Sequence, residues 1–246
     1  MLEKAAKAMA EKKKGLAFTG AGMSTASGIP DFRSPGGVWS RYDIRKLAYL
    51  DCFFENPARV WEFFQKRVAE YGKSLPNEGH TALALLESLG VLEGVATQNI
   101  DMLHQKGGSK RVFELHGSLG KMNCLECGQE YNMPGRERWK EGLPYCECGA
   151  LLKPGVVFFG EALNAAVLNA AREMAKKSGF ILVAGTSGEV FPAAGIPYEA
   201  ARKGSLIVEV NDRPTPFTSS LSDFFLEGRV EEVLPELSQK VGEFLT

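Results

Sequence analysis

Four of the five cysteines form two closely spaced pairs, a pattern that is typical of a metal site. Two residues separate Cys124 from Cys127, and one residue separates Cys146 from Cys148. Four thiolates can bind Zn²⁺ tetrahedrally and leave no position open for water, as in structural rather than catalytic sites. We therefore predict one structural zinc ion, with two unrelated pairs of buried cysteines as the alternative. Cys52 stands alone and is expected to be a buried apolar residue.

The three histidines differ in their surroundings. His116 directly follows the apolar run 112–115 and precedes a glycine, so it is expected at the end of a strand. A histidine in that place can act as a base near neutral pH, although its position alone leaves a structural role equally open. His80 and His104 lie near the starts of predicted helices and are expected to be structural.

A glycine loop follows the first apolar run of the chain. Residues 20–24, Gly-Ala-Gly-Met-Ser, come directly after the run 16–19, where backbone amides can approach a pyrophosphate. As a dinucleotide fingerprint the loop is imperfect, because Thr25 occupies the third glycine position and no helix is predicted to open there. A simple tight turn is the alternative.

Short apolar runs that end in glycine or polar residues indicate how these groups are positioned. Such runs fit strands buried on both faces of a parallel sheet, and the helical patterns between them indicate an α/β fold. Ligands bind at the carboxyl edge of such sheets, so one cleft is expected to collect the polar residues there. The runs are 16–19, 94–97, 112–115, 155–159, 180–184, 206–210 and 224–226, and the helical patterns are 81–90, 163–177, 192–203 and 230–245.

Two segments interrupt this alternation. Residues 29–77 are rich in aromatic side chains and are predicted to form a helical insert with its own small core. Residues 121–153 hold the four paired cysteines.

The composition excludes several classes of protein. Of 246 residues, 44% are hydrophobic and 24% charged, which excludes wholesale disorder, and the strongly apolar stretches are too short to span a bilayer. Residues 1–14 are lysine-rich without an apolar core, so a secretory signal is not expected and we predict a cytoplasmic protein. The net charge of −1 favours neither a membrane nor direct nucleic acid binding.

Seven ordered motifs resemble those of the sirtuins, the NAD-dependent protein deacylases of the silent-information-regulator family. The similarity extends from about residue 15 to residue 235 and is of the compact microbial type. The motifs are Gly20-Ala21-Gly22-Met23-Ser24, Gly28-Ile29-Pro30-Asp31-Phe32-Arg33, Thr97-Gln98-Asn99-Ile100-Asp101, Leu115-His116-Gly117, the cysteine pairs, Val157-Phe158-Phe159-Gly160-Glu161 and Gly185-Thr186-Ser187.

The resemblance implies a Rossmann-like, NAD-binding parallel-sheet domain formed by residues 1–30, 78–120 and 154–246. Residues 31–77 and 121–153 would together form a smaller domain that is helical and binds zinc. NAD, a co-substrate rather than a hydride carrier, would meet an acyl-lysine protein or peptide in the cleft. The products would be free lysine, nicotinamide and O-acyl-ADP-ribose, with His116 as the base and Asn99 holding ribose or water.

The resemblance also implies roles at matching positions. Ile29 and Asp101 would form the carboxamide pocket, and residues 157–160 would offer a strand edge to the peptide. Residues expected to contact NAD are Gly20, Ala21, Gly22, Ser24, Ile29, Asp31, Phe32, Arg33, Gln98, Asn99, Ile100, Asp101, Gly185, Thr186, Ser187, Asn211, Arg229 and Val230. Those expected to contact the acylated peptide are Phe64, Arg67, Val157, Phe158, Phe159, Gly160 and Val190.

One departure from the family pattern concerns the acyl group. Family members that remove succinyl or malonyl groups carry Tyr-x2-Arg where this chain has Phe64 and Arg67. Arg67 keeps the charge that can pair with an acyl carboxylate, but Phe64 lacks the hydroxyl. The sequence therefore predicts mainly deacetylation with weak removal of succinyl or malonyl groups. The alternative is that both residues simply line a helix of the insert.

Other departures are the Cys-x-Cys form of the second cysteine pair, Gly188-Glu189 near the cleft, and Asp212-Arg213 after Asn211. Two alternative functions remain. The chain could be an NAD-binding sensor without turnover, or an ADP-ribosyltransferase that uses the same cleft. A zinc-ribbon protein that binds nucleic acid is disfavoured by the neutral charge.

Overall fold

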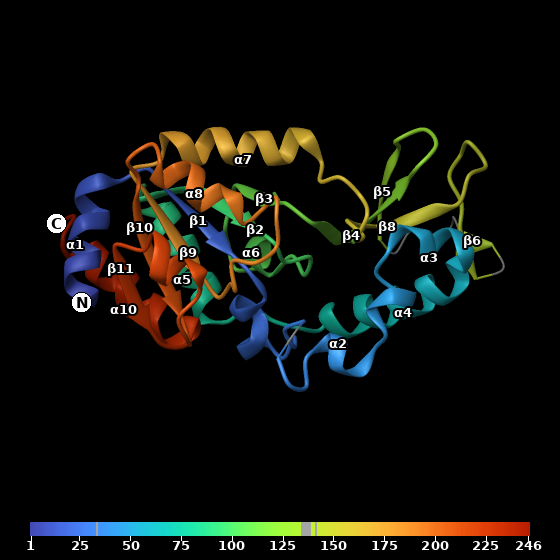
Figure 1. Ribbon diagram of the computed structural model, residues 1–246, viewed down its shortest axis with the longest axis horizontal. Helices are drawn as coiled ribbons and strands as arrows, with labels where there is room; N and C mark the ends of the chain where they lie inside the picture. Colours follow the sequence, from blue (N-terminus) through green and yellow to red (C-terminus); the bar gives the residue numbers. More distant parts are fainter. Residues whose placement is uncertain (33, 134–138, 141) are drawn as a thin grey trace.

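The computed structural model describes residues 1–32, 34–133, 139–140 and 142–246. A large α/β unit lies at the left of Figure 1, and a smaller unit of helices and antiparallel strands lies at the right. The predicted fold class is confirmed. Both termini lie at the far end of the large unit (Figure 1). Among the described residues, no helix is both long and apolar enough to cross a membrane.

In the described part of the chain, six parallel strands form the main sheet, in the order β11-β10-β9-β1-β2-β3. Both β1 and β9 are buried along their whole length, which explains their continuous apolar sequence. Six of the seven predicted runs are confirmed as strands of this sheet. The strands are β1 (Gly15–Thr19), β2 (Leu92–Thr97), β3 (Val112–Glu114), β9 (Phe180–Ala184), β10 (Leu206–Asn211) and β11 (Phe224–Glu227).

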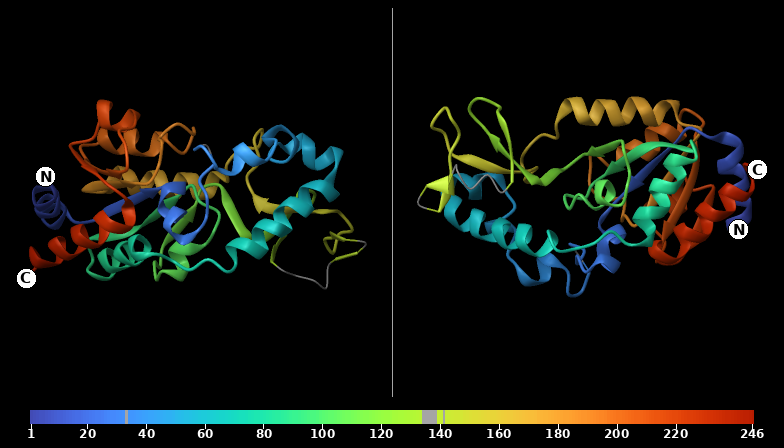
Figure 2. Two further views of the ribbon diagram at one scale, coloured as in Figure 1. Left: turned by 90° about the horizontal axis from the view of Figure 1, so that it is seen from below. Right: turned by 180° about the vertical axis from the view of Figure 1, so that it is seen from behind.

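Helices cover both faces of this sheet (Figure 2). The core on one face joins β-strand side chains to α1 (Leu2–Lys12), α5 (Glu78–Ser88) and α10 (Val230–Glu243). The core on the other face uses α7 (Ala165–Lys177), α8 (Gly195–Ala201) and α9 (Pro216–Ser220). Small residues let the helices pack closely: Ala171 and Ala175, one turn apart on α7, are completely buried.

The order of the strands determines where a ligand can bind. The chain proceeds from β1 to β2 and β3 on one side, then returns to place β9, β10 and β11 on the other side. The strand order therefore reverses between β1 and β9, and such a switch point leaves a crevice at the carboxyl ends of the strands. In the sheet register, Thr19 of β1 pairs with Thr97 of β2 and with Ala184 of β9. The loops that follow these three strands therefore start side by side at the same edge of the sheet.

The small unit is built around an antiparallel sheet in the order β5-β4-β8. The run 155–159 was expected in the parallel sheet, and this prediction is wrong: β8 ends at Val156 and pairs antiparallel with β4. The small unit comprises α2 (Val38–Arg41), η2 (Ile44–Lys46), α3 (Leu50–Glu55), α4 (Pro57–Tyr71), β4 (Gly117–Cys124), β5 (Glu130–Asn132), β6 (Trp139–Lys140), β7 (Leu143–Pro144) and β8 (Leu152–Val156).

The two inserts share one core, so the prediction that the aromatic insert has a core of its own is also wrong. Phe53, Trp61 and Phe64 of the helical insert pack in one cluster with Met122 and Leu152 of the antiparallel sheet. The Trp61 indole, which is almost completely buried, donates a hydrogen bond of 2.9 Å to the Leu152 carbonyl. A buried indole N–H needs such an acceptor, and this bond fixes α4 against β8.

A short helix that the sequence did not predict also lies at the switch point, beside the ends of the strands. A 3₁₀ helix, η1 (Ala21–Ser27), opens directly after β1, and Gly28 ends it with a positive φ of 81°. Asn77, at the start of α5, donates to the Met23 carbonyl and to the Ser27 hydroxyl at 2.8 and 3.1 Å. These bonds fix the helix beside the cleft.

Candidate functional site

A cleft of about 1120 Å³ lies at the switch point, between the large and the small unit. Its walls come from the loops after β1, β2, β9 and β10, from α4, and from the segment that follows β8. The cleft is large enough for a dinucleotide together with part of a second ligand. It brings together most of the residues that the sequence singled out.

The glycine loop after β1 touches the loop after β9. The Gly22 amide donates to the Gly185 carbonyl at 2.8 Å. A Cβ on Gly20 would stand 2.7 Å from the Thr186 Cβ, and one on Gly22 would stand 2.8 Å from the Gly185 Cα. Glycine is therefore required for the two loops to touch, and this contact keeps the floor of the cleft free of side chains.

Asn99 is held rigidly behind this glycine loop. Its Nδ2 donates to the Gly20 carbonyl at 3.0 Å and to the Ser24 hydroxyl at 3.2 Å, and its own amide donates to the Thr97 hydroxyl. Ser24 in turn donates to a carboxylate oxygen of Asp101 at 2.7 Å. All four side chains are buried.

Asp101 is the acidic end of this network. Burial raises the pKa of its carboxyl group, whereas hydrogen bonds from the Leu103 amide and the Ser24 hydroxyl lower that pKa. Both donors stabilise the ionised form. Asp101 thus orients Ser24, and through it Asn99, from one layer behind the cleft.

His116 lies at the junction of the two units. It follows β3 and immediately precedes β4, and it lines the cleft. Its Nδ1 lies 3.0 Å from the Gln98 carbonyl oxygen, which can only accept a hydrogen bond. In the neutral ring the proton is therefore on Nδ1, and Nε2 carries the free lone pair. Burial lowers the pKa of His116, and the hydrogen bond to Gln98 partly opposes this shift.

His80 and His104 lie away from the cleft lining, as expected for structural residues. His80 belongs to the capping box of α5, and its ring lies 4.9 Å from that of His104. The Nε2 of His104 lies 2.9 Å from the Thr19 hydroxyl. Burial lowers the pKa of His80 to about 4 and that of His104 to about 3, so both rings are neutral at pH 7.

The apolar end of the cleft is formed by α4 and the segment after β8. Phe64 stacks on Phe158 with ring centroids 5.4 Å apart and an interplanar angle of 12°. Tyr71, which the sequence analysis missed, also lines this end. It lies four residues after Arg67 and seven after Phe64, and this helical spacing could have identified it.

The guanidinium of Arg67 already has partners. One nitrogen pairs with the Glu70 carboxylate at 2.8 Å, and the other donates to the Tyr42 hydroxyl at 2.7 Å. The group also lies over the rings of Tyr42 and Phe63, at 4.8 and 5.2 Å from their centroids. Arg67 therefore brings a positive charge to the cleft lining, and the Glu70 carboxylate partly neutralises that charge.

The predicted peptide-binding segment, residues 157–160, hydrogen-bonds to the protein along one side. The Phe159 amide donates to the Ala48 carbonyl at 2.7 Å, and the Phe159 carbonyl accepts from the Leu50 amide at 3.1 Å. The Val157 amide donates to the His116 carbonyl. The Phe158 amide donates to the Glu161 carboxylate, so the amides of residues 157–159 are all engaged, whereas a Cβ on Gly160 would meet nothing within 4 Å. Gly160 is therefore the part of the segment with space for a partner.

At the opposite end of the cleft, Asn211 supports the loop after β10. Its Nδ2 donates to the carbonyls of Thr186 and Arg213 at 3.4 and 3.2 Å. Behind this loop, the fully buried Glu209 accepts hydrogen bonds from the hydroxyls of Thr215, Thr218 and Ser222. These bonds hold the loop between β10 and β11 in place.

The structure places most predicted residues in the lining, with a few exceptions. Ser24, Ile29 and Asp101 lie behind the lining, and Arg33 lies outside the described residues. The predicted residues that line the cleft are Gly20, Ala21, Gly22, Asp31, Phe32, Phe64, Arg67, Gln98, Asn99, Ile100, His116, Val157, Phe158, Phe159, Gly160, Gly185, Thr186, Ser187, Val190, Asn211, Arg229 and Val230.

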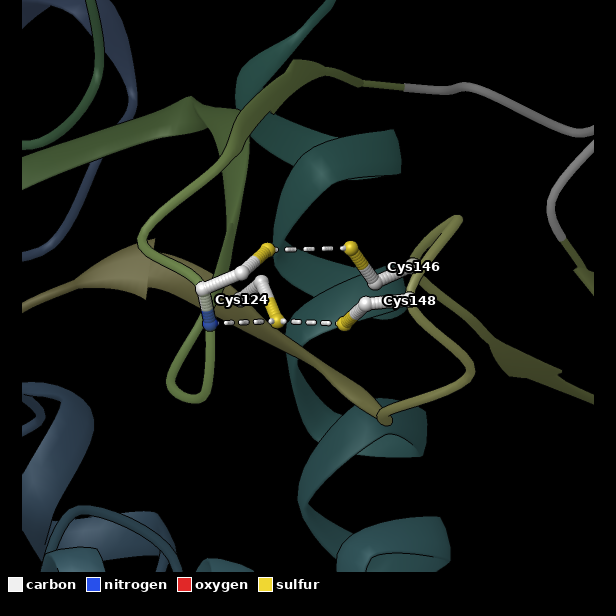
Figure 3. Close-up of side chains that lie close together, drawn as sticks. Cys124, Cys146 and Cys148 are labelled. Atoms are coloured by element: carbon white, nitrogen blue, oxygen red, sulfur yellow. Dashed lines mark hydrogen bonds between the residues drawn. The ribbon is translucent and has the colours of Figure 1, made fainter.

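The four paired cysteines converge in the small unit, and Figure 3 shows the sulfurs of Cys124, Cys146 and Cys148 close together. The Sγ of Cys124 lies 3.6 Å from that of Cys148, and the Sγ of Cys127 lies 3.5 Å from that of Cys146. Four sulfurs at the Zn–S distance of about 2.3 Å from one tetrahedral ion would be roughly 3.8 Å apart. The donor set and its spacing fit a structural zinc ion.

Glycines with positive φ shape both cysteine turns. Gly128, with φ 75°, donates to the Cys124 carbonyl, and Gly149, with φ 90°, donates to the Cys146 carbonyl. Each turn can therefore close directly behind its pair of thiolates, and the Cys-x-Cys pair reaches the same cluster as the Cys-x2-Cys pair. Cys52, expected to be buried, is only half-buried, and its thiol hydrogen-bonds to a backbone carbonyl.

The chain is similar to known proteins along its whole length. A family model described as Sir2 family matches residues 20–192. An NAD-dependent protein deacylase of Pyrococcus furiosus is 43% identical, over 98% of this chain and 98% of that protein. An NAD-dependent protein deacetylase of Pyrobaculum aerophilum is also 43% identical, over 99% of this chain and 96% of that protein.

Solved structures agree with these matches. A complex of a Sir2 homologue with NAD superposes with a TM-score of 0.91 at 41% identity, covering 99% of this chain and 95% of that one. A Sir2 protein bound to a propionylated peptide superposes with a TM-score of 0.83 at 32% identity, covering 97% of both chains.

The cysteine geometry predicts one zinc ion per chain. Elemental analysis of protein purified without chelator should give a zinc-to-protein ratio near one, and about zero for Cys124→Ser/Cys146→Ser. Removing the zinc should lower the thermal stability of the small unit, because its core then loses the cross-link between two turns. Cys52→Ser is the matched control and should retain the metal. A full complement of zinc in the double variant would contradict this assignment.

Proposed function

The chain belongs to the Sir2 family and is an NAD-dependent protein deacylase, and we propose that His116 is its catalytic base. The observation that carries this proposal is the position of His116 between the two halves of the cleft, with Nδ1 held by the Gln98 carbonyl. The lone pair of Nε2 is then available for a proton. A lowered pKa keeps the ring neutral at physiological pH, as a base requires.

The glycine end of the cleft is the proposed site for NAD. The overall conversion takes an acyl-lysine, NAD and water to free lysine, nicotinamide and O-acyl-ADP-ribose. The loop contact between Gly22 and Gly185 offers a floor of backbone to the phosphates, and Asn211 supports the adenosine side. Asn99, fixed by Gly20 and Ser24, is proposed to orient ribose or water beside His116.

The aromatic end of the cleft is the proposed site for the acylated lysine. Phe64 and Phe158 would enclose its aliphatic chain, and Gly160 would contribute to backbone pairing with the peptide. Pairing of this kind reads backbone rather than side chains, so selectivity for peptide sequence should be loose. We propose accordingly that residues 31–77 and 121–153 act together as a substrate-binding small domain.

The polar contacts of Arg67 support acetyl as the main acyl group. A succinyl carboxylate entering an apolar pocket must be paired to offset its desolvation. Arg67 can pair with it, but Glu70 already occupies part of the guanidinium and Phe64 has no hydroxyl to offer. Removal of succinyl or malonyl groups is therefore proposed to be weak. We still predict that the protein is cytoplasmic, that it acts on acylated proteins and that it does not bind nucleic acid directly.

His116→Ala tests the proposed base. The unaltered protein should release nicotinamide from NAD only when an acetylated peptide is present, with loss of the acetyl mass from the peptide. His116→Ala should fold and bind NAD but lose turnover by roughly 10²- to 10⁴-fold. His104→Gln, which keeps a partner for Thr19, is the control and should retain most activity. Near-normal turnover by His116→Ala would refute the role of the base.

The pH dependence follows from the same residue. A base must be unprotonated, and a pKa below the ordinary value of about 6.5 keeps His116 neutral to lower pH. The value of kcat/KM should therefore stay level as the pH falls to about 6.5 and decrease only below it. The rate should be measured with a peptide that lacks histidine, with zinc content checked at each pH. A decrease that begins at or above pH 7 would oppose this account.

Acyl preference is tested by two substitutions on α4. Phe64→Tyr should raise kcat/KM for a succinylated peptide roughly tenfold, since one hydrogen bond to a charged group contributes about 1.5 kcal/mol or more. Arg67→Ala should abolish desuccinylation and reduce deacetylation less. Phe54→Tyr and Arg59→Ala are matched controls on exposed side chains and should change neither rate. Strong desuccinylation that survives in Arg67→Ala would show that Arg67 does not bind the acyl carboxylate.

A further inference from the structure

An ion pair lies at the peptide-binding end of the cleft, between Lys153 behind the lining and Glu161, which is part of the lining with its side chain 15% exposed. Lys153, on β8, is only 3% exposed and does not line the cleft. Its ammonium pairs with a carboxylate oxygen of Glu161 at 3.0 Å. It also donates to the carbonyls of Pro154 and Val156, at 3.0 and 2.6 Å. The three N–H donors of the ammonium thus have three acceptors, all within one short stretch of chain.

The same pair contacts the residue that forms the wall of the acyl pocket. The carboxylate oxygen of Glu161 that binds Lys153 also accepts a hydrogen bond of 2.6 Å from the Phe158 amide. The Lys153 ammonium lies 4.2 Å from the centroid of the Phe158 ring, within the range of a cation–π interaction. That ring in turn stacks on Phe64. Both the backbone and the side chain of Phe158 are therefore fixed by the ion pair.

We propose that Lys153 and Glu161 are positioning residues for the acylated peptide, which hold residues 156–161 and the Phe158 ring in the conformation that binds it. This inference rests on the proposed function of the cleft. The segment leaves the antiparallel sheet at Val156 and has no regular secondary structure from Val157 to Phe158. An ion pair that joins its two ends supplies the order that a continuing strand would otherwise provide.

A gain in the free energy of unfolding does not by itself explain why the chain has this ion pair. Burial lowers the pKa of Lys153, although Glu161 opposes the shift, so the ammonium is kept charged against a desolvation cost. Well-packed apolar residues often stabilise a fold as well as a buried ion pair does. Directional bonds from one ammonium to three oxygens fix a conformation in a way that apolar contacts do not.

The test separates positioning from stability. Lys153→Met leaves the mostly buried Glu161 carboxylate without its cation, so it should lower the melting temperature and raise KM for the peptide. Lys153→Met/Glu161→Gln removes both charges. The double variant should recover much of the melting temperature, yet KM for the acetylated peptide should stay about tenfold above that of the unaltered protein, because small misplacements of a binding segment are costly. KM for NAD should change by less than about twofold, and kcat should change less than the peptide KM.

The exposed ion pair between Lys121 and Glu130, on the neighbouring strands β4 and β5, provides the control. Lys121→Met should change neither KM. The inference is overturned if peptide KM returns to normal together with the melting temperature in the double variant, or if KM for NAD rises as much as KM for the peptide. The proposed function fails in a different way, by the absence of peptide-dependent nicotinamide release from the unaltered protein.

Discussion

The contact between the loops that follow β1 and β9 is the constraint on which the rest of the site depends. These neighbouring strands lie where the strand order reverses, so the chain runs on from them to helices on opposite faces of the sheet and a crevice remains above their ends. Gly20, Gly22 and Gly185 let the two backbones touch, and a side chain at any of these positions would force the loops apart. Asn99 is bound to the Gly20 carbonyl, so the side chain proposed to orient ribose or water depends on the same contact. The network of Ser24 and Asp101 supports it from behind.

His116 connects the loops of the large unit to the proposed peptide-binding segment, residues 157–160. Its ring is oriented by the Gln98 carbonyl of the large unit, while its own carbonyl accepts from the Val157 amide at the start of the peptide-binding segment. One residue therefore links the proposed NAD half of the cleft to the proposed peptide half. Burial at this junction also lowers the pKa of the ring, so the geometry that orients the proposed base also favours its unprotonated form.

Both inserts contribute to the proposed acyl pocket, and they share one core. Phe64 comes from the helical insert and Phe158 from the chain that leaves the cysteine-containing module, and the two rings stack. The hydrogen bond from Trp61 to Leu152 fixes the relative position of the two inserts, and the cysteine cluster closes the module behind them. The structural metal thus supports the shape of a pocket in which it takes no part chemically.

The sequence by itself determined the parallel sheet, the residues at its carboxyl edge, the four clustered cysteines and the family. Strand burial, glycine after a strand and cysteine spacing are local patterns, and seven motifs in order carry the resemblance. Only the tertiary structure decided which groups meet. It paired β8 antiparallel with β4, placed Asp101 behind the lining, engaged Arg67 with Glu70 and Tyr42, and joined Lys153 to Glu161. The physical reason is that hydrophobic period and spacing report whether a residue is buried, whereas its partner is chosen by long-range packing, hydrogen-bond geometry and charge.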